Sequence, residues 1–204
     1  MGALLVGLLA ACAPSSAQEP EPVVSSAPAG PTTAAPRPAP PHVPVRDATA
    51  PTPAHGAAPV RLAIRSLDLD MAVVPVGVAD DGTMQIPPDA YQAGWYRFGP
   101  TPAARGNTVL AAHVDSRLSG IGPFAQLRHL DAGASVVVTD AAGARHRYRV
   151  ASVRKVPKRD APVASWFARD GRPRLVLVTC GGAWQPKIGH YADNVVVIAD
   201  PTGG

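Results

Sequence analysis

From residue 60 onward, apolar residues gather in short runs that turn-forming residues separate. The runs at 108–112 and 175–179 are apolar except for one Thr each and contain Val, as strands buried on both faces require. Segments 80–82 (Asp-Asp-Gly) and 140–143 (Asp-Ala-Ala-Gly) begin with Asp and end with Gly, in the manner of tight turns. The pattern predicts strands at residues 60–65, 71–78, 84–86, 108–113, 135–140, 145–153, 174–179 and 194–199.

Helical periodicity is slight in the same part of the chain. Segments 124–130 and 164–169 are each long enough for one or two turns, and a Pro-containing segment leads into both. Many short strands with regular turn spacing are typical of a barrel or a sandwich. The predicted fold class is therefore mainly β, with one or two short helices.

The first 59 residues have a different composition. They hold 13 of the 24 prolines and no Phe, Trp or Tyr, so they cannot bury enough apolar surface to offset the entropy of ordering. We predict a disordered Pro/Ala-rich spacer at 13–59 with polyproline II character, and one folded domain at 60–204. The spacer shows no coiled-coil heptads, so a monomer is expected.

The chain begins with a short apolar run, residues 3–11, that ends at Cys12. This has the form of a lipobox and predicts an export signal at 1–12 with Cys12 as the lipidation site. The run is shorter than the about 20 residues that span a bilayer, so a transmembrane anchor requires a start further upstream. An unprocessed apolar start is the alternative. The lipoprotein interpretation predicts a domain tethered to the outer face of the cell membrane.

The formal net charge is +4, which does not indicate nucleic-acid binding. Seven Lys and Arg residues nevertheless concentrate between positions 145 and 159. The alternation of charge at 145–149 fits the solvated face of an edge strand. Attraction to anionic wall polymers or lipid headgroups is the other interpretation that this cluster allows.

Cys180 stands where an apolar strand runs into Gly181 and Gly182. A strand fixes the sulfur of a nucleophile, and the glycines permit close approach of a substrate and offer N–H groups to an oxyanion. Thr179, Gly181 and Gly182 are the predicted substrate-binding residues. Cys12 lies at the other end of the chain, so no disulfide between the two cysteines is expected. Cys180 is then a lone thiol, either catalytic or a small buried side chain.

His113 ends another apolar strand at a polar turn, where an imidazole can hold a thiolate or pass a proton to a leaving amine. His129, His146 and His190 are the other candidates; His146 lies in the charged strand and His190 in an expected loop after Cys180. No His/Cys cluster has metal-ligand spacing, so no metal site is predicted.

Several stretches of the domain resemble the sortase family, and specifically its short, class F-like members. They occur in order over nearly the whole domain. The stretches are Gly94-Trp95-Tyr96, Gly99-Pro100, residues 105–116 with His113, residues 177–182 with Cys180, and residues 189–197.

The resemblance implies an eight-stranded sortase-type barrel and a cysteine transpeptidase that needs no cofactor. Cys180 would attack the Thr carbonyl of a Leu-Pro-x-Thr-Gly-like sorting signal, and His113 would act as acid toward the departing amine. The implied partners are surface proteins that carry this signal and a peptidoglycan precursor amine that resolves the thioacyl enzyme. Other cell-wall cysteine enzymes fit less well because their cysteine motifs and chain order differ.

One residue departs from the family pattern. Sortases of this type carry an arginine where this chain has Ala192. Either the enzyme is impaired, or another cation such as Lys187 or Arg174 takes the role. A non-catalytic, sortase-like lipoprotein that binds a peptide or partner is the alternative function. Four aromatic residues are expected in the core or, alternatively, in a peptide groove: Trp95, Tyr96, Trp166 and Trp184.

Overall fold

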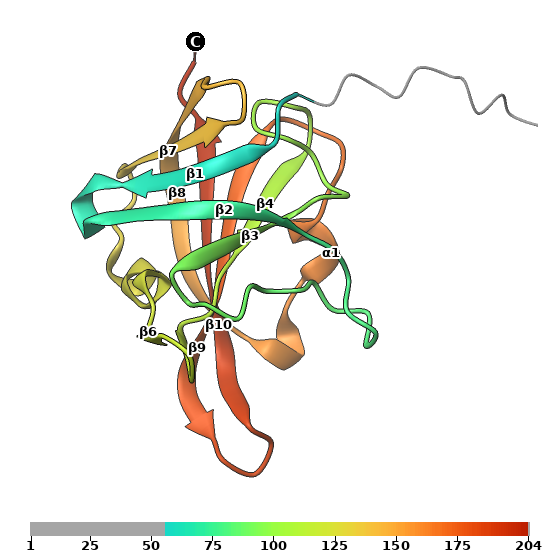
Figure 1. Ribbon diagram of the computed structural model, residues 1–204, viewed down its shortest axis with the longest axis vertical. Helices are drawn as coiled ribbons and strands as arrows, with labels where there is room; N and C mark the ends of the chain where they lie inside the picture. Colours follow the sequence, from blue (N-terminus) through green and yellow to red (C-terminus); the bar gives the residue numbers. More distant parts are fainter. Residues whose placement is uncertain (1–55, 204) are drawn as a thin grey trace, which may run out of the picture. The chain divides into compact units, whose positions relative to one another are not determined.

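The computed structural model describes residues 56–203, and eight of its strands build the framework of the fold (Figure 1). The predicted export signal at 1–12, Cys12 and nearly all of the predicted spacer lie outside these residues. The framework strands are β1 (Pro59–Ile64), β2 (Leu69–Val76), β3 (Gln92–Tyr96), β4 (Asn107–Ala111), β7 (Ser135–Asp140), β8 (Arg145–Pro157), β9 (Arg174–Gln185) and β10 (His190–Pro201).

These strands close into a barrel in the order β1-β2-β3-β4-β9-β10-β8-β7, with β7 paired back to β1. The pairs β2–β3 and β4–β9 are parallel, and the other pairs are antiparallel. Closure pairs every strand on both sides and leaves the barrel without an open edge. The predicted mainly β, eight-stranded barrel is confirmed.

Short elements connect the barrel strands. The predicted helical segments near 124–130 and 164–169 are present as one 3₁₀ helix and one single-turn α-helix. The short elements are η1 (Arg65–Leu67), β5 (Asp115–Ser116), β6 (Gly120–Ile121), η2 (Pro123–His129), η3 (Lys158–Asp160) and α1 (Val163–Trp166). None of the helices in residues 56–203 is long and apolar enough to cross a membrane.

One predicted strand is wrong and one was missed. Residues 84–86 form only an isolated bridge between Met84 and Val78, because the Gln85 side chain accepts the Gly77 N–H at 3.1 Å beside a turn. The eighth barrel strand is β3 instead, although it contains Gly94 and no β-branched residue. A Cβ on Gly94 would lie 2.9 Å from a Val76 methyl group, so close packing against β2 excludes a larger residue there.

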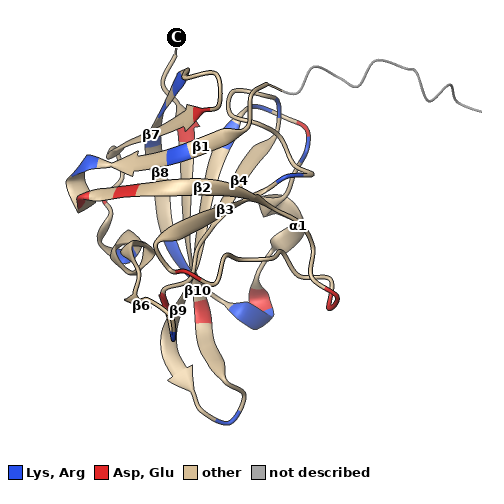
Figure 2. Cartoon of the chain, in the orientation of Figure 1, with Lys and Arg blue, Asp and Glu red and all other residues tan. Residues whose placement is uncertain are grey.

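The basic strand β8 is not an edge strand, which corrects the expectation from its charge pattern. It pairs with β7 on one side and β10 on the other. The alternation itself is as expected: Arg145, Arg147 and Arg149 are exposed while Tyr148 is buried. Lys and Arg residues are scattered over several strands and loops, with Asp residues between them (Figure 2).

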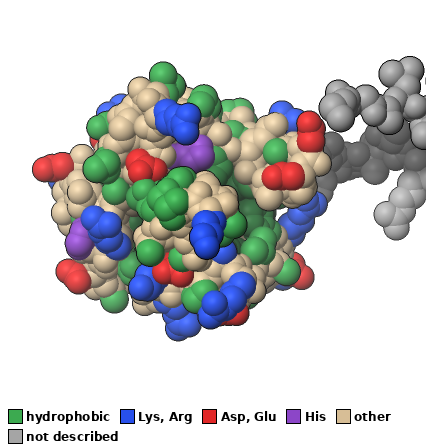
Figure 3. All heavy atoms as spheres, turned by 90° about the horizontal axis from the view of Figure 1, so that it is seen from below, with side chains coloured by type: hydrophobic (Ala, Val, Ile, Leu, Met, Phe, Trp, Pro, Cys, Tyr) green, Lys and Arg blue, Asp and Glu red, His purple; other side chains and the backbone are tan. Residues whose placement is uncertain are grey.

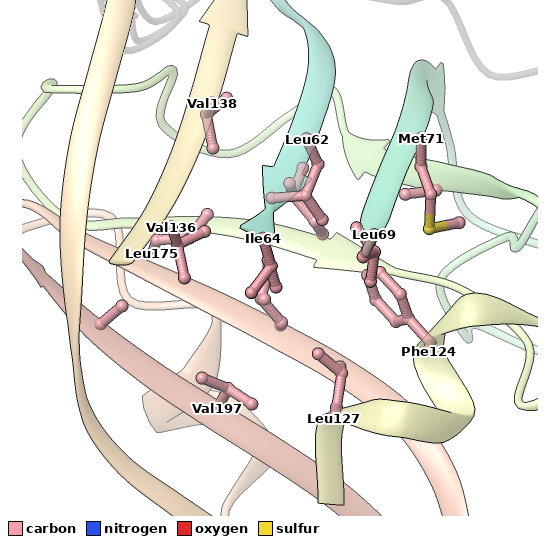
Figure 4. Close-up of a cluster of buried hydrophobic side chains, with 14 of the residues drawn as sticks. Leu62, Ile64, Leu69, Met71, Phe124, Leu127, Val136, Val138, Leu175 and Val197 are labelled. Atoms are coloured by element: carbon pink, nitrogen blue, oxygen red, sulfur yellow. The ribbon is translucent and has the colours of Figure 1, made fainter. Parts of the chain in front are cut away.

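Apolar side chains fill the barrel, and η2 closes one end of it. Phe124 and Leu127 project from η2 toward Ile64 and Leu69 and have no exposed surface (Figure 4). Burial of each of these two side chains contributes about 1.5–3 kcal/mol to the stability of the fold. A second cluster lies outside the barrel wall, where Trp166 of α1 packs on Val109, Val176 and Val196. The two clusters hold β4, β9 and β10 from both faces.

Candidate active site

Cys180 lies on the outer face of the barrel wall, in β9. Val176 of the second cluster precedes it by four residues, and side chains alternate along a strand, so both point outward. Asn194 of β10 is its cross-strand partner. Cys180 is a free, partly exposed thiol, and packing on both faces of β9 fixes its backbone.

The strand does not end at the cysteine, as the sequence suggested, but continues to Gln185 through a β-bulge. Asp193 is paired with Gly181 and Tyr191 with Trp184, so Gly182 and Ala183 together face the single residue Ala192. Gly182 has φ +75°, a left-handed conformation that favours glycine at a bulge. The bulge interrupts the ladder directly after Cys180, and the hairpin extends past the barrel (Figure 1).

His113 lies two residues beyond the end of β4, on a segment tied to β9. The Ala112 N–H donates to the Val178 carbonyl at 3.3 Å, and the Thr179 hydroxyl donates to the Ala112 carbonyl at 2.8 Å. Thr179 is buried, so its hydroxyl is already used within the protein rather than turned to a substrate. Thr179, directly before Cys180, therefore fixes the position of Ala112, directly before His113.

Thr179→Val is expected to destabilise the domain by about 1–3 kcal/mol, because the buried Ala112 carbonyl loses its hydroxyl donor while the side-chain volume hardly changes. Urea unfolding of both proteins measures the difference. Thr179→Ser keeps the hydroxyl and should recover most of the loss. Equal stability of the Val and wild-type proteins would contradict this role.

Cys180 stands between two hollows in the surface. The first, of about 570 Å³, is lined by His113, Arg117, Trp184 and His190 as well as Cys180. The second, of about 330 Å³, has Gly181, Gly182 and Thr179 in its lining together with the basic residues Arg128, Arg154 and Lys155. The two hollows share only four lining residues: Val114, Asp115, Cys180 and Tyr191.

Of those four shared residues, the sequence indicated a role only for Cys180, and two of the others contact each other. The Tyr191 hydroxyl donates a hydrogen bond to Asp115 Oδ2 at 2.5 Å. This bond, with partial burial and the charges of Asp115 and Cys180, raises the pKa of Tyr191 above its ordinary value. The Tyr191 ring packs edge-on against Trp184 with centroids 5.2 Å apart. The contact between Tyr191 and Asp115 could not be predicted from the sequence alone, because the two residues are 76 positions apart.

An apolar groove of about 460 Å³ lies on the same outer face, beside α1. Val109, Ala111 and Val178 form its floor, and Trp166 and Phe167 are among its walls. Val178 precedes Cys180 by two residues on the same face, about 7 Å along the strand. An extended apolar peptide bound there would lead toward the thiol.

The other histidines considered as partners of Cys180 lie in different parts of the domain. His190 begins β10 and lines the first hollow, so it is not in a loop. His146 contacts Asp140 at 2.8 Å at the β7–β8 turn, and the Arg128 Nε–H donates to the His129 ring. Among residues 56–203, no three His, Cys, Asp or Glu side chains gather as a metal site.

The cations suggested as replacements for the missing arginine are not placed for that role. Arg174 begins β9, six residues before Cys180, and its guanidinium lies 3.2 Å from Asp200. Lys187 lies in the turn between β9 and β10 and does not line either of the two hollows. Arg117 lines the hollow that holds both His113 and Cys180.

The aromatic residues divide between core and surface. Trp95 is buried in the barrel, Trp166 is buried in the second cluster, and Tyr96 packs edge-on against Phe167. Trp184 is 52% exposed on the hairpin beside Cys180. Apolar side chains also gather on the face seen from below, with a histidine and charged side chains next to them (Figure 3).

Comparison with solved structures gives the same architecture. The chain superposes on the sortase D5 transpeptidase of Clostridium perfringens with a TM-score of 0.53 and 14% identity, covering 72% of this chain and 79% of that one. Sortase A of Listeria monocytogenes gives 0.51 and 18%, covering 72% and 88%. Sortase C-1 of Actinomyces oris gives 0.53 and 19%, covering 71% and 73%. At such identities the likeness shows the fold alone.

No curated protein matches the sequence. The family model of the sortase domain, however, matches residues 62–202, which is almost the whole of the barrel described above. A match over that length, together with the closed barrel, shows that this chain belongs to the sortase family.

Proposed function

We propose that this chain is a cysteine transpeptidase that cleaves a Leu-Pro-x-Thr-Gly-like sorting signal and transfers it to an amine of the cell wall. The observation that carries the proposal is the presence of Cys180 and His113 in the lining of one open hollow. Family membership supports the reaction type, and the apolar groove beside Val178 supports an extended peptide substrate.

In the first half of the reaction, Cys180 Sγ attacks the carbonyl carbon of the substrate Thr and forms a C–S bond. The carbonyl electrons move onto its oxygen and return as the Thr–Gly C–N bond breaks. His113 receives the proton of the Cys180 thiol as the sulfur attacks and donates it to the departing amine, which is a poor leaving group without it. A thioacyl enzyme remains, and the Gly-terminated fragment leaves.

In the second half, an acceptor amine attacks the thioester carbon and His113 receives a proton from it. The C–S bond breaks, and His113 passes that proton to the departing sulfur, which restores the thiol on Cys180. A peptidoglycan precursor is the proposed acceptor. The two hollows that meet at Cys180 support separate approaches for the signal and the amine, and no step of this sequence uses a metal or cofactor.

Gly181 and Gly182 are the proposed substrate-binding residues. Both glycines follow Cys180 directly in the sequence and line the second hollow. The bulge at Gly182 breaks the regular ladder there, which suits N–H groups that must face a developing oxyanion rather than a neighbouring strand.

Ala192 favours a second candidate function, a sortase-like protein that binds a peptide without turning it over. Ala192 faces the bulge next to Cys180, so a guanidinium is missing at the site where the family pattern has one. Retention of both Cys180 and His113 supports the enzyme, because binding alone requires neither.

The finer setting of the protein belongs to the same proposal. The stretch Gly189-His190-Tyr191 and the short domain support a class F-like sortase. Lipidation at Cys12 and a spacer at 13–59 would tether a monomeric domain to the outer face of the membrane. Mass spectrometry of the membrane fraction tests this, and an unmodified Cys12 would remove the lipoprotein anchor.

Intact-mass analysis of the protein with a Leu-Pro-x-Thr-Gly peptide tests the function. A thioester adduct is expected on the wild-type protein and absent from Cys180→Ala. A folded wild-type protein that binds the peptide without any adduct would instead support the non-catalytic alternative.

A further inference from the structure

The imidazole of His113 stands on a segment that β4 no longer supports. β4 ends at Ala111, and the next strand, β5, begins at Asp115. Within residues 56–203, β5 pairs only with β6, and the Gly122 N–H donates to the Val114 carbonyl at 2.9 Å, so residues 114–122 form a small ribbon outside the barrel ladder. The Ala90 N–H donates to Ser119 Oγ at 2.9 Å and holds the far end of this ribbon. The place of His113 relative to Cys180 then depends on the contacts between the near end and the β9–β10 hairpin.

Two side-chain hydrogen bonds from that hairpin flank His113. Thr179 Oγ1 donates to the carbonyl of Ala112, immediately before the histidine. Tyr191 Oη donates to the carboxylate of Asp115, two residues after it. The first bond belongs to the buried wall of the barrel, whereas the second lies between the two hollows where Cys180 is exposed.

The tyrosine is itself well held. Tyr191 and Trp184 are cross-strand partners, and their rings meet at 70°. An aromatic pair in this geometry restrains both side chains beyond the effect of their burial. The phenol therefore presents its hydroxyl from a fixed position, and its raised pKa keeps it a protonated donor in neutral solution.

We propose that Tyr191 and Asp115 are a positioning pair whose hydrogen bond ties the His113 segment to the Cys180 hairpin and sets the distance between imidazole and thiol. The inference rests on the proposed function, because it assigns a role within that reaction. Proton transfer tolerates little displacement, so a tie of this kind acts on the chemical step and not on peptide binding.

Four variants test the pair. Tyr191→Phe and Asp115→Ala each remove the hydrogen bond and should lower kcat for thioester formation about 10-fold, the equivalent of one such bond, with KM for the peptide unchanged. Asp115→Asn keeps an acceptor and should recover most of the rate lost in Asp115→Ala. The double variant Tyr191→Phe/Asp115→Ala should be no slower than either single variant.

The opposite results are equally clear. A defect in Asp115→Asn as large as in Asp115→Ala would assign the role to the charge and overturn the hydrogen-bond pair. Multiplying defects in the double variant, or a rise in KM with kcat unchanged, would overturn it too. Tyr91→Phe is the matched control, since Tyr91 is 54% exposed at the surface. Thermal unfolding of each variant verifies that it is folded.

Alkylation of Cys180 by iodoacetamide gives a readout that needs no substrate. The His113→Ala variant gives the alkylation rate of the Cys180 thiol in the absence of the imidazole. Tyr191→Phe and Asp115→Ala should shift the wild-type rate toward that value, and rates equal to wild type would overturn the pair. If the wild-type protein forms no thioester at all, the proposed function fails while this assay still tests the positioning.

Discussion

His113→Ala is expected to slow formation of the thioester on Cys180 by about 10²- to 10⁴-fold, the range that a positioned acid or base contributes. Without the imidazole, the amine of the substrate Gly would have to leave as an unprotonated group. The side chain is partly exposed in an open hollow, so its removal leaves no buried cavity and the barrel should stay folded. Quenched-reaction mass spectrometry with the sorting-signal peptide measures the rate.

Two other histidines make the experiment specific. His190→Ala tests the second imidazole in the lining of the Cys180 hollow, and its effect should be much smaller. His129→Ala removes an exposed imidazole on η2 and serves as the general control. A large loss in His190→Ala with little change in His113→Ala would exchange the roles that we assign to these two residues.

The barrel was largely predictable because most of its strands are buried and therefore have apolar sequences. β4 is buried at every position and β9 nearly so before Cys180, which gives continuous apolar runs that no helix period explains. β3 was missed because close contact between Gly94 and Val76 selects glycine, a residue that composition associates with turns. The edge position of β8 was wrong because β8 lies between β7 and β10, and the charge pattern of one strand does not show which strands pair with it.

The candidate site was predictable only in part. Cys180 and His113 each end an apolar run, so the sequence marks them one at a time, and family resemblance joins them. Tyr191 and Asp115 lie inside the same matched stretches, but their hydrogen bond depends on the bulge that shifts the β10 register by one residue. Arg174 is six residues from Cys180 in the sequence, but both lie in the extended strand β9, and the Arg174 guanidinium is paired with Asp200.

Ala192→Arg is expected to raise the rate of thioester formation by about 10²-fold, since loss of one oxyanion donor typically costs 10²- to 10³-fold. Ala192 faces Gly182 and Ala183 across the bulge, so a new guanidinium would enter beside Cys180. Asp193 could capture it, but Lys155 Nζ already lies 3.8 Å from that carboxylate. Single-turnover kinetics on the wild-type and Ala192→Arg proteins measures the gain.

Ala192→Lys is the matched control, because it supplies the charge without the planar fork of an arginine. A gain in Ala192→Arg that exceeds the gain in Ala192→Lys would mean that bidentate contact with the substrate matters. No gain in either variant would contradict an empty arginine position and direct attention to Arg117, which lines the hollow of His113 and Cys180. Arg117→Ala would then be expected to lose most of the wild-type rate, because it removes the Arg from the lining of that hollow.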